Sequence, residues 1–128
     1  FWYAKALVYM RKDDYKNCIA NCDVVLTLDS MNIEANYFKG LAYCNMAKAS
    51  SDAMKKSELK SAAYRKYRTE MMTYYALAEE PLEQVRRLSP DKASRWAPLL
   101  YQVYLNQNKG EEFDEMERII RDIKKPEK

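Results

Sequence analysis

Hydrophobic residues recur along this chain at intervals of three and four, which is the spacing of one face of an α-helix. In the stretch from Asp14 to Leu28, the residues with this spacing are Tyr15, Cys18, Ile19, Cys22, Val25 and Leu26. Near the end of the chain they are Phe113, Met116, Ile120 and Ile123. No segment alternates with a period of two, so the pattern predicts helices and no strands.

The pattern also repeats along the chain. The residues Tyr3, Lys5, Ala6, Leu7 and Tyr9 return as Tyr37, Lys39, Gly40, Leu41 and Tyr43, and each residue number is higher by 34 the second time. A self-match at a fixed period of this length is the signature of a helical repeat array, in which each repeat is one helix-turn-helix unit. The sequence therefore predicts an all-α fold before any single residue is interpreted.

The repeat resembles the tetratricopeptide repeat (TPR), whose pattern has a Trp, then a Leu and a Gly, then Tyr, Ala, Phe and Pro. In the first repeat, the Trp, Gly, Tyr, Ala and Phe places are taken by Trp2, Ala6, Tyr9, Cys18 and Cys22. The matching residues of the later repeats are Asn36, Gly40 and Tyr43 in the second, and Trp96 and Leu99 in the third. Three places depart from the pattern: Lys5 stands for Leu, Ser30 for Pro and Asn36 for Trp.

The resemblance implies a right-handed superhelical array of about three repeats in a single domain, residues 1–128. Repeat one would span 1–32, repeat two 33–90 and repeat three 91–125. The stretch from Glu79 to Ile120 is also similar to the C-terminal part of TPR proteins common in the Bacteroidetes, many of them exported. This similarity implies a bacterial protein, and it leaves the choice between periplasm and cytoplasm open.

The N-terminal residues also bear on how the repeat array ends. The 128 residues contain no signal peptide, and the repeat is already under way at Trp2. Terminal repeats need a polar outer face, which Phe1, Trp2 and Tyr3 do not supply. We therefore expect further residues or a partner chain to cover them.

The second repeat carries an insertion, because Asp29 and Ser30 match Ser89 and Pro90 at a separation of 60, which exceeds the period of 34 by 26. We place it at about 48–75, with a helix start at Ser50, Ser51 and Asp52. A stripe with helical spacing follows, formed by Tyr64, Tyr67, Met71, Tyr74, Tyr75 and Ala78. If the whole insertion lengthened the second helix of the repeat, that helix would grow by about 39 Å. The sequence does not decide whether it projects or folds back on the repeats.

Prolines mark further boundaries. Ser89 before Pro90 is typical of an N-cap followed by the first residue of a helix. A helix that begins there holds Pro98 in its interior, where a proline removes one backbone hydrogen bond. We therefore expect a kink near Ser94 to Trp96, or a first turn that is separate from the rest of the helix.

Composition excludes several classes of protein. Hydrophobic residues make up 48% of the chain and charged residues 32%, with only two Gly, which is typical of an ordered helical protein. No apolar run approaches the ~18 residues that cross a bilayer. The chain has no His, no Gly-rich phosphate loop and no nucleophile elbow, so an enzyme would depend on scattered carboxylates such as Glu79, Glu80 and Glu83. We expect no enzymatic activity and no cofactor.

The three cysteines raise the question of a metal site. Cys18 and Cys22 lie one turn apart, but a zinc site normally needs four ligands in paired short spacings. Both residues also occupy inward places of the repeat, where a free Cys acts as a small hydrophobic residue. We expect core packing and no metal.

Charge gathers in the insertion. Residues 48–70 contain seven Lys or Arg and three acids, a net charge of +4, whereas the whole chain carries +3. Nucleic acid, anionic lipid or an acidic protein could bind such a surface. The alternative is a solvated helix face. The residues of this second candidate surface are Lys55, Lys56, Arg65, Lys66 and Arg68.

In the TPR family the concave groove is lined mainly by the first helix of each repeat. Carried over to this chain, the groove positions are Tyr3, Leu7, Met10, Phe38, Leu41, Asn45, Tyr101 and Tyr104. Their apolar and aromatic character suits an extended peptide or a helix with hydrophobic anchors. The Lys, Asn and Arg clamp that holds the carboxylate of chaperone tails is missing, since Tyr3, Phe38 and Ser94 stand at such places.

The resemblance therefore implies a non-enzymatic module that binds a protein or peptide. A scaffold that self-associates, through the edge at Phe1 to Tyr3 or through the Tyr and Met stripe of the insertion, is the alternative. Binding of nucleic acid by the basic insertion is the third hypothesis, and no RNA- or DNA-binding motif supports it.

Overall fold

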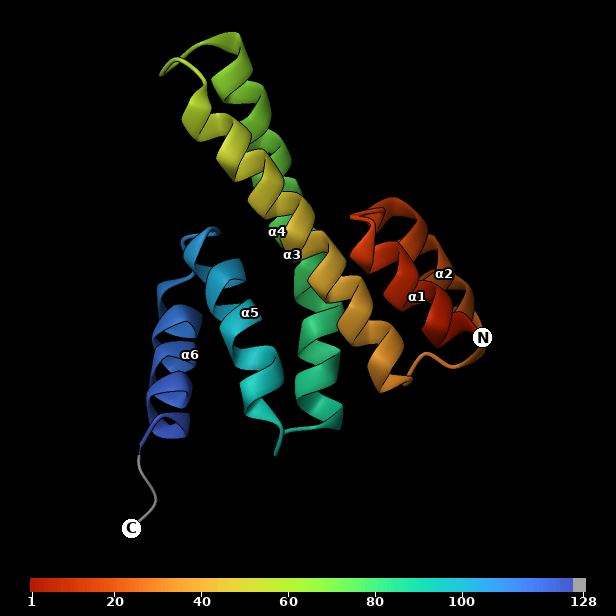
Figure 1. Ribbon diagram of the computed structural model, residues 1–128. Coiled ribbons are helices and arrows are strands. Elements are labelled where there is room, and N and C mark those ends of the chain that lie inside the picture. The colour runs from red at the N-terminus through yellow and green to blue at the C-terminus, as the bar shows by residue number, and fades with distance from the viewer. Residues whose placement is uncertain (126–128) are drawn as a thin grey trace.

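The computed structural model describes residues 1–125 as six α-helices, with no strand in that range (Figure 1). The helices are α1 (Trp2–Arg11), α2 (Tyr15–Leu28), α3 (Ile33–Lys56), α4 (Ala62–Leu88), α5 (Ala93–Leu105) and α6 (Gly110–Ile123). The prediction of an all-α fold is confirmed. None of the described helices is both long enough and apolar enough to cross a membrane.

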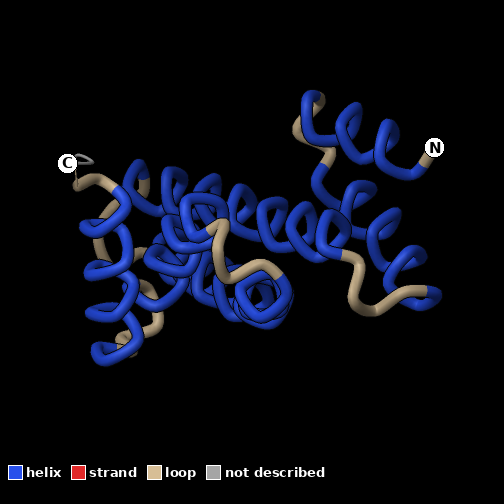
Figure 2. The backbone as a smooth tube through the Cα atoms, turned by 90° about the horizontal axis from the view of Figure 1, so that it is seen from below, coloured by secondary structure: helices blue, strands red, loops and turns tan. Residues whose placement is uncertain are grey.

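The helices form three consecutive pairs, α1 with α2, α3 with α4, and α5 with α6 (Figure 1). Each helix packs against the next along the chain, and the first helices also meet, α1 with α3 and α3 with α5. The first pair makes no contact with the third, and the two ends of the chain lie at opposite ends of the row (Figure 2). This is a repeat-like arrangement in which each pair contacts only its neighbours.

Two hydrophobic clusters stabilise the row, and α3 contributes to both. The first joins the first pair to α3 and contains Ala6, Cys18, Ile19, Cys22, Ala35, Phe38 and Ala42. The second joins α3 to the last three helices, with Leu82, Val85, Leu100, Val103 and Met116 among its buried side chains. The cysteines expected in the core are indeed buried and unpaired.

Similar hydrogen bonds tie two of the connecting segments to the helix that follows. The Asn36 amide donates to the carbonyl of Ser30 at 3.2 Å, and the Trp96 indole N–H donates to the carbonyl of Ser89 at 2.9 Å. The two donors are 60 residues apart, like Ser30 and Pro90, but the two acceptors are 59 residues apart. The two bonds are therefore alike in kind and differ by one residue in position.

The insertion differs from the expectation, because both helices of the second pair share it. Helix α3 has 24 residues against 10 in α1, and α4 has 27 against 14 in α2. The chain turns at 57–61, so the added residues form a helical hairpin that projects beyond the other helices (Figure 1). Each helix grows by about 20 Å at ~1.5 Å per residue, about half the length expected for one helix. Residues 50–52 continue α3 and start no helix.

The hairpin packs on itself, which explains the Tyr and Met stripe. Met71 and Tyr75 of α4 are buried together with Cys44 and Ala47 of α3. The hydroxyl of Ser50 donates to the carboxylate of Glu70 at 3.3 Å, across the two helices. Since α3 covers the stripe, the hairpin projects without leaving it bare.

The expected boundaries around Ser89 were wrong. Ser89 follows the last residue of α4, and α5 begins only at Ala93, after Lys92. Helix α5 is continuous from there through Pro98. The residues from Ser89 to Lys92 form a turn separate from it, in which the N–H of Lys92 donates to the carbonyl of Ser89 at 3.1 Å. Helix α4 likewise continues through Pro81, which is buried.

Candidate functional site

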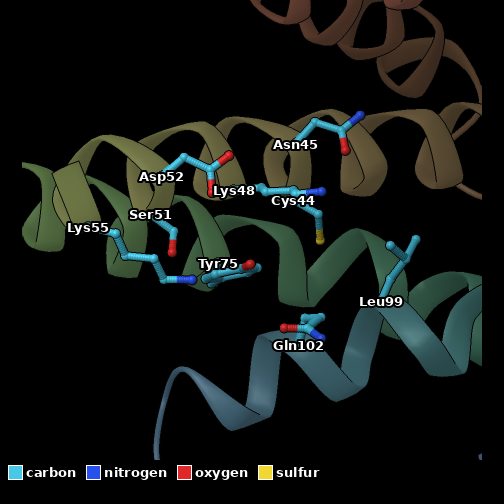
Figure 3. Close-up of a pocket in the computed structure, with 9 residues that line it drawn as sticks. All are labelled: Cys44, Asn45, Lys48, Ser51, Asp52, Lys55, Tyr75, Leu99 and Gln102. Atoms are coloured by element: carbon cyan, nitrogen blue, oxygen red, sulfur yellow. The ribbon is translucent and has the colours of Figure 1, made fainter.

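A notch lies between the projecting half of α3 and the neighbouring α5, with α4 behind it (Figure 3). Its volume is about 350 Å³. The lining residues are Cys44, Asn45, Lys48, Ser51, Asp52 and Lys55 of α3, Tyr75 of α4, and Leu99 and Gln102 of α5. Four of the nine, Lys48, Ser51, Asp52 and Lys55, come from the part of α3 that the insertion adds.

Helical spacing explains why these residues share one wall. Asn45, Lys48, Asp52 and Lys55 follow one another at intervals of three and four, so their side chains lie on one face of α3. Other faces of α3 pack against α2 and α4. The face toward α5 is left open beyond Cys44, because α5 is only 13 residues long and does not follow the hairpin to its tip (Figure 1).

The notch combines amide groups with an apolar floor. Asn45 and Gln102 each carry one amide, from different helices. The hydroxyl of Ser51 adds a further donor and acceptor. Cys44 and Leu99 supply apolar surface, together with the ring of Tyr75 (Figure 3).

The two titratable groups of the floor stay protonated at neutral pH. Burial raises the pKa of the Cys44 thiol to about 12. Burial also raises the pKa of Tyr75, and the neighbouring Cys44 and Asp52 raise it further. A thiol that is not ionised is a poor nucleophile, so the floor offers contacts and no reactive anion.

The charged residues of the notch are free of partners. Lys48, Asp52 and Lys55 form no ion pair with any residue of the described range. Two cations and one anion leave a net charge of +1 in the notch.

Of the groove residues carried over from the family pattern, only Asn45 lies in the notch. Phe38 and Tyr104 were expected in an open groove, but both are buried, with side chains only 6% and 3% exposed. Phe38 fills the space between α2 and α3 left by small neighbours, and its ring contacts that of Tyr3, with centroids 5.4 Å apart. Tyr104 lies in the second cluster, where its hydroxyl donates to the carboxylate of Glu83.

The remaining groove residues lie apart from the notch. Leu7 and Met10 are half-buried against the first cluster, and Leu41 is also half-buried. Tyr101 packs on Phe113 of α6, with ring centroids 4.7 Å apart. Of the eight residues, only Asn45 therefore lines the notch.

The sequence reasoning missed Ser51, Leu99 and Gln102, and it saw Lys48 and Asp52 only as part of a charged segment. For the residues of α3, the reason is that a helix start was expected at Ser50, inside what is one continuous helix. The signal that could have placed Lys48 and Asp52 on one wall is the unbroken spacing of three and four through Asn45, Lys48, Asp52 and Lys55.

The second candidate surface divides between the notch and the outside of the hairpin. Lys55 lines the notch, whereas Lys56, Arg65, Lys66 and Arg68 are exposed elsewhere on the hairpin. The ammonium of Lys66 lies 5.7 Å from the centre of the Tyr67 ring. Among residues 1–125, no group of three His, Cys, Asp or Glu side chains is placed to hold a metal ion.

No family model matches this chain, and comparisons with curated proteins and with solved structures found no match. Function therefore has to be argued from the arrangement of the helices and from the notch.

Proposed function

We propose that this protein is a non-enzymatic helical-repeat module, similar to TPR domains, that binds a segment of another polypeptide in the notch between α3 and α5. The sequence period of 34 and the contacts of α1 with α3 and of α3 with α5 support the repeat architecture. Asn36 and Trp96, 60 residues apart, each donate to a carbonyl of the preceding connection, which also supports it.

The observation that carries the proposal is the pair of amide side chains in the notch. Asn45 and Gln102 each offer both a donor and an acceptor, which is what the backbone of an extended peptide needs. Leu99 and Tyr75 between them offer apolar surface to a side chain of that peptide (Figure 3). A site with an apolar floor and a few polar groups is the usual composition of a binding pocket.

The test is a displayed-peptide selection, with the Asn45→Leu/Gln102→Leu variant as the counter-selection. The substitutions keep much of the side-chain volume and remove the amides. A matched control, Asn17→Leu/Gln84→Leu, makes the same changes on α2 and α4, outside the notch. Circular dichroism checks that all three proteins are folded.

We expect peptides that bind the wild type and the control equally and the notch variant about tenfold more weakly, from two lost hydrogen bonds of about 0.5–1.5 kcal/mol each. Equal affinity for the notch variant would show that the peptides bind elsewhere. A selection that enriches no peptide would also refute the proposal.

The outer face of α1 favours a second candidate function, self-association. Phe1, Ala4 and Val8 stand one repeat period before Ala35, Phe38 and Ala42, which are buried between the first two pairs. In α1 the same positions are exposed, Phe1 at 108% and Val8 at 46%. The outer face of α1 thus has the apolar positions that α3 uses to dock on the first pair.

The occupant proposed for this face is the α5–α6 edge of a second copy. That edge has an open groove of about 390 Å³, lined by Pro98, Tyr101, Gln102, Glu117, Ile120 and Lys124. Helix α1 contains two bases and no acid, whereas α6 contains six acids and two bases. Opposite charges at the two ends favour a head-to-tail contact.

Sedimentation velocity tests this second candidate. We expect a mass that rises with concentration and falls in Val8→Glu, while Val24→Glu, an exposed valine of α2, leaves it unchanged. A protein that stays monomeric at high concentration would exclude the contact.

A further inference from the structure

We infer that the segment bound in the notch is acidic, and that Lys48 and Lys55 pair with two of its carboxylates. The inference rests on the proposed function, and it names the class of partner for the same site.

The two lysines have no ionic partner among residues 1–125. Some cations elsewhere pair with acids of another helix, as Lys39 does with Asp23 at 2.7 Å and Lys109 with Glu79 at 3.0 Å, whereas others, such as Lys5, Lys16 and Arg118, are also without an ion pair. No Lys or Arg of the hairpin forms such a pair with any described residue. The positive charge of the hairpin is therefore available to a partner.

The geometry of α3 places the two ammonium groups along the notch. Lys48 and Lys55 are seven residues apart, about two turns or ~10.5 Å of helix, and they share one face. Figure 3 shows the end of Lys55 pointing toward Tyr75 and that of Lys48 lying near Cys44. In a segment with the polyproline II conformation, which has three residues per turn and rises ~3.1 Å per residue, carboxylates three residues apart lie on the same side and span a similar distance.

Asp52 lies between the lysines and limits the number of acids that the notch takes. It is four residues after Lys48 and three before Lys55, one turn from each. Its charge would repel a third carboxylate at the middle of the segment. The middle of the segment is therefore expected to be neutral, with an apolar side chain toward Leu99 and Tyr75.

The surroundings of the notch add to the attraction. Residues 48–70 carry a net charge of +4, and the rest of the chain sums to −1. A field of one sign raises the rate at which an oppositely charged partner arrives, and salt screens it.

A nucleic acid is the other anionic partner, and the observations favour a polypeptide. Recognition of single strands depends on aromatic rings on which bases can stack. Tyr75 is only 6% exposed, and Tyr64 and Tyr67 are half-buried. The free amides of Asn45 and Gln102 suit a peptide backbone instead.

The test uses synthetic peptides taken from the selection, each with a partner in which every Glu or Asp is replaced by the amide. The notch variant is Lys48→Gln/Lys55→Gln. The matched control is Lys60→Gln/Lys66→Gln, which removes the same charge from the same hairpin outside the notch. Fluorescence anisotropy gives Kd at low and at high salt.

We expect acids three residues apart in the enriched peptides, and a loss of about tenfold in affinity at low salt in the notch variant. The control should lose less than about threefold, and the amide peptides should bind the wild type and the notch variant alike. An equal loss in both lysine pairs would overturn the inference, because long-range charge alone would then explain the binding.

Two other outcomes overturn it as well. Neutral peptides that depend on Asn45 and Gln102 would leave the proposed function standing and refute the acidic partner. A poly(dT) strand could also bind more tightly than any acidic peptide and lose this binding in Lys48→Gln/Lys55→Gln. That result would show that the lysines bind nucleic acid.

Discussion

The substitution Gly40→Ala tests how closely α3 and α4 pack. A Cβ atom built on Gly40 would lie 2.5 Å from Cγ and 2.6 Å from Cδ2 of Leu82. Carbon atoms that are not bonded prefer a separation of about 3.5–4.0 Å, so one side chain or one helix has to move. Leu82 is completely buried in α4, and the atom nearest to the added methyl is its branch point, which turns little when the side chain rotates.

Two opposing effects set the magnitude. Alanine in the interior of a helix is about 1 kcal/mol more favourable than glycine. Forcing an extra methyl group into a packed core costs about 1–3 kcal/mol, and the short contacts with Leu82 place this case at the upper end. We therefore expect the free energy of unfolding to fall by about 1–2 kcal/mol in Gly40→Ala, measured by urea denaturation with circular dichroism.

The chain offers a matched control in its other glycine. A Cβ on Gly110, the first residue of α6, meets no atom within 4 Å, so Gly110→Ala is expected to be neutral or stabilising by up to about 1 kcal/mol. Leu82→Ala makes room for the methyl group added by Gly40→Ala, so the double variant should lose about 1 kcal/mol less than the sum of the single ones. The reasoning is refuted if Gly40→Ala stabilises the protein as Gly110→Ala does, or if the two losses simply add.

Three further predictions concern contacts between helices, and urea denaturation measures each of them. The Arg95 guanidinium, hydrogen-bonded to Glu34, lowers the pKa of that carboxyl below its ordinary 4.5, so stability present above pH 4.5 is lost as the pH falls. The loss of stability at acid pH should be smaller in Glu34→Gln. If stability depended on pH in the same way in the variant and the wild type, this prediction would be contradicted. Burial raises the pKa of Cys44 from 9.0 to about 12, so stability should fall as the pH rises above 9.0, and less steeply in Cys44→Ala; equal slopes would contradict this. Trp96→Phe leaves the carbonyl of Ser89 without its indole donor and should cost about 1–3 kcal/mol, whereas no loss would mean that water replaces the donor.

Local spacing was enough to predict the helices. The second helix was expected from Asp14 to Leu28 and is observed at Tyr15–Leu28, because one apolar face defines its whole length. The start of the second repeat at 33 also agrees, since Asn32 caps α3 by accepting a hydrogen bond from the N–H of Ala35 at 2.9 Å. Such signals lie within a few residues of the structure they determine.

The sequence could not predict that the insertion is shared between α3 and α4, because no typical turn residue marks the point where the chain reverses. Residues 57–61 contain neither Gly nor Pro, the residues that usually indicate a turn. Lys60 adopts the left-handed conformation there, with φ at 64°, a geometry more often taken by Gly or Asn. Ser50 to Asp52, in contrast, look like a helix start and continue a helix.

Phe38 is buried and not in an open groove for a different reason, which is the size of its neighbours. A family pattern assigns a place by register and assumes ordinary residues around it. Here Cys18, Cys22 and Ala42 are small, and the ring of Phe38 occupies the space that they leave. Close packing of the core explains the burial of the Phe38 ring, because an empty cavity in the core costs more free energy than an aromatic ring contributes at the surface.

The sharing of the insertion between α3 and α4 also explains why charged residues can line the notch. Between residues 51 and 70 no side chain is fully buried, so the outer half of the hairpin adds little to either core cluster. Lysines there keep their ammonium groups in water and need no partner for the chain to fold. Lys48 follows the buried Ala47 in the chain and is nevertheless exposed, because it lies on another face of α3. Both lysines of the notch can therefore stay charged without a cost in stability.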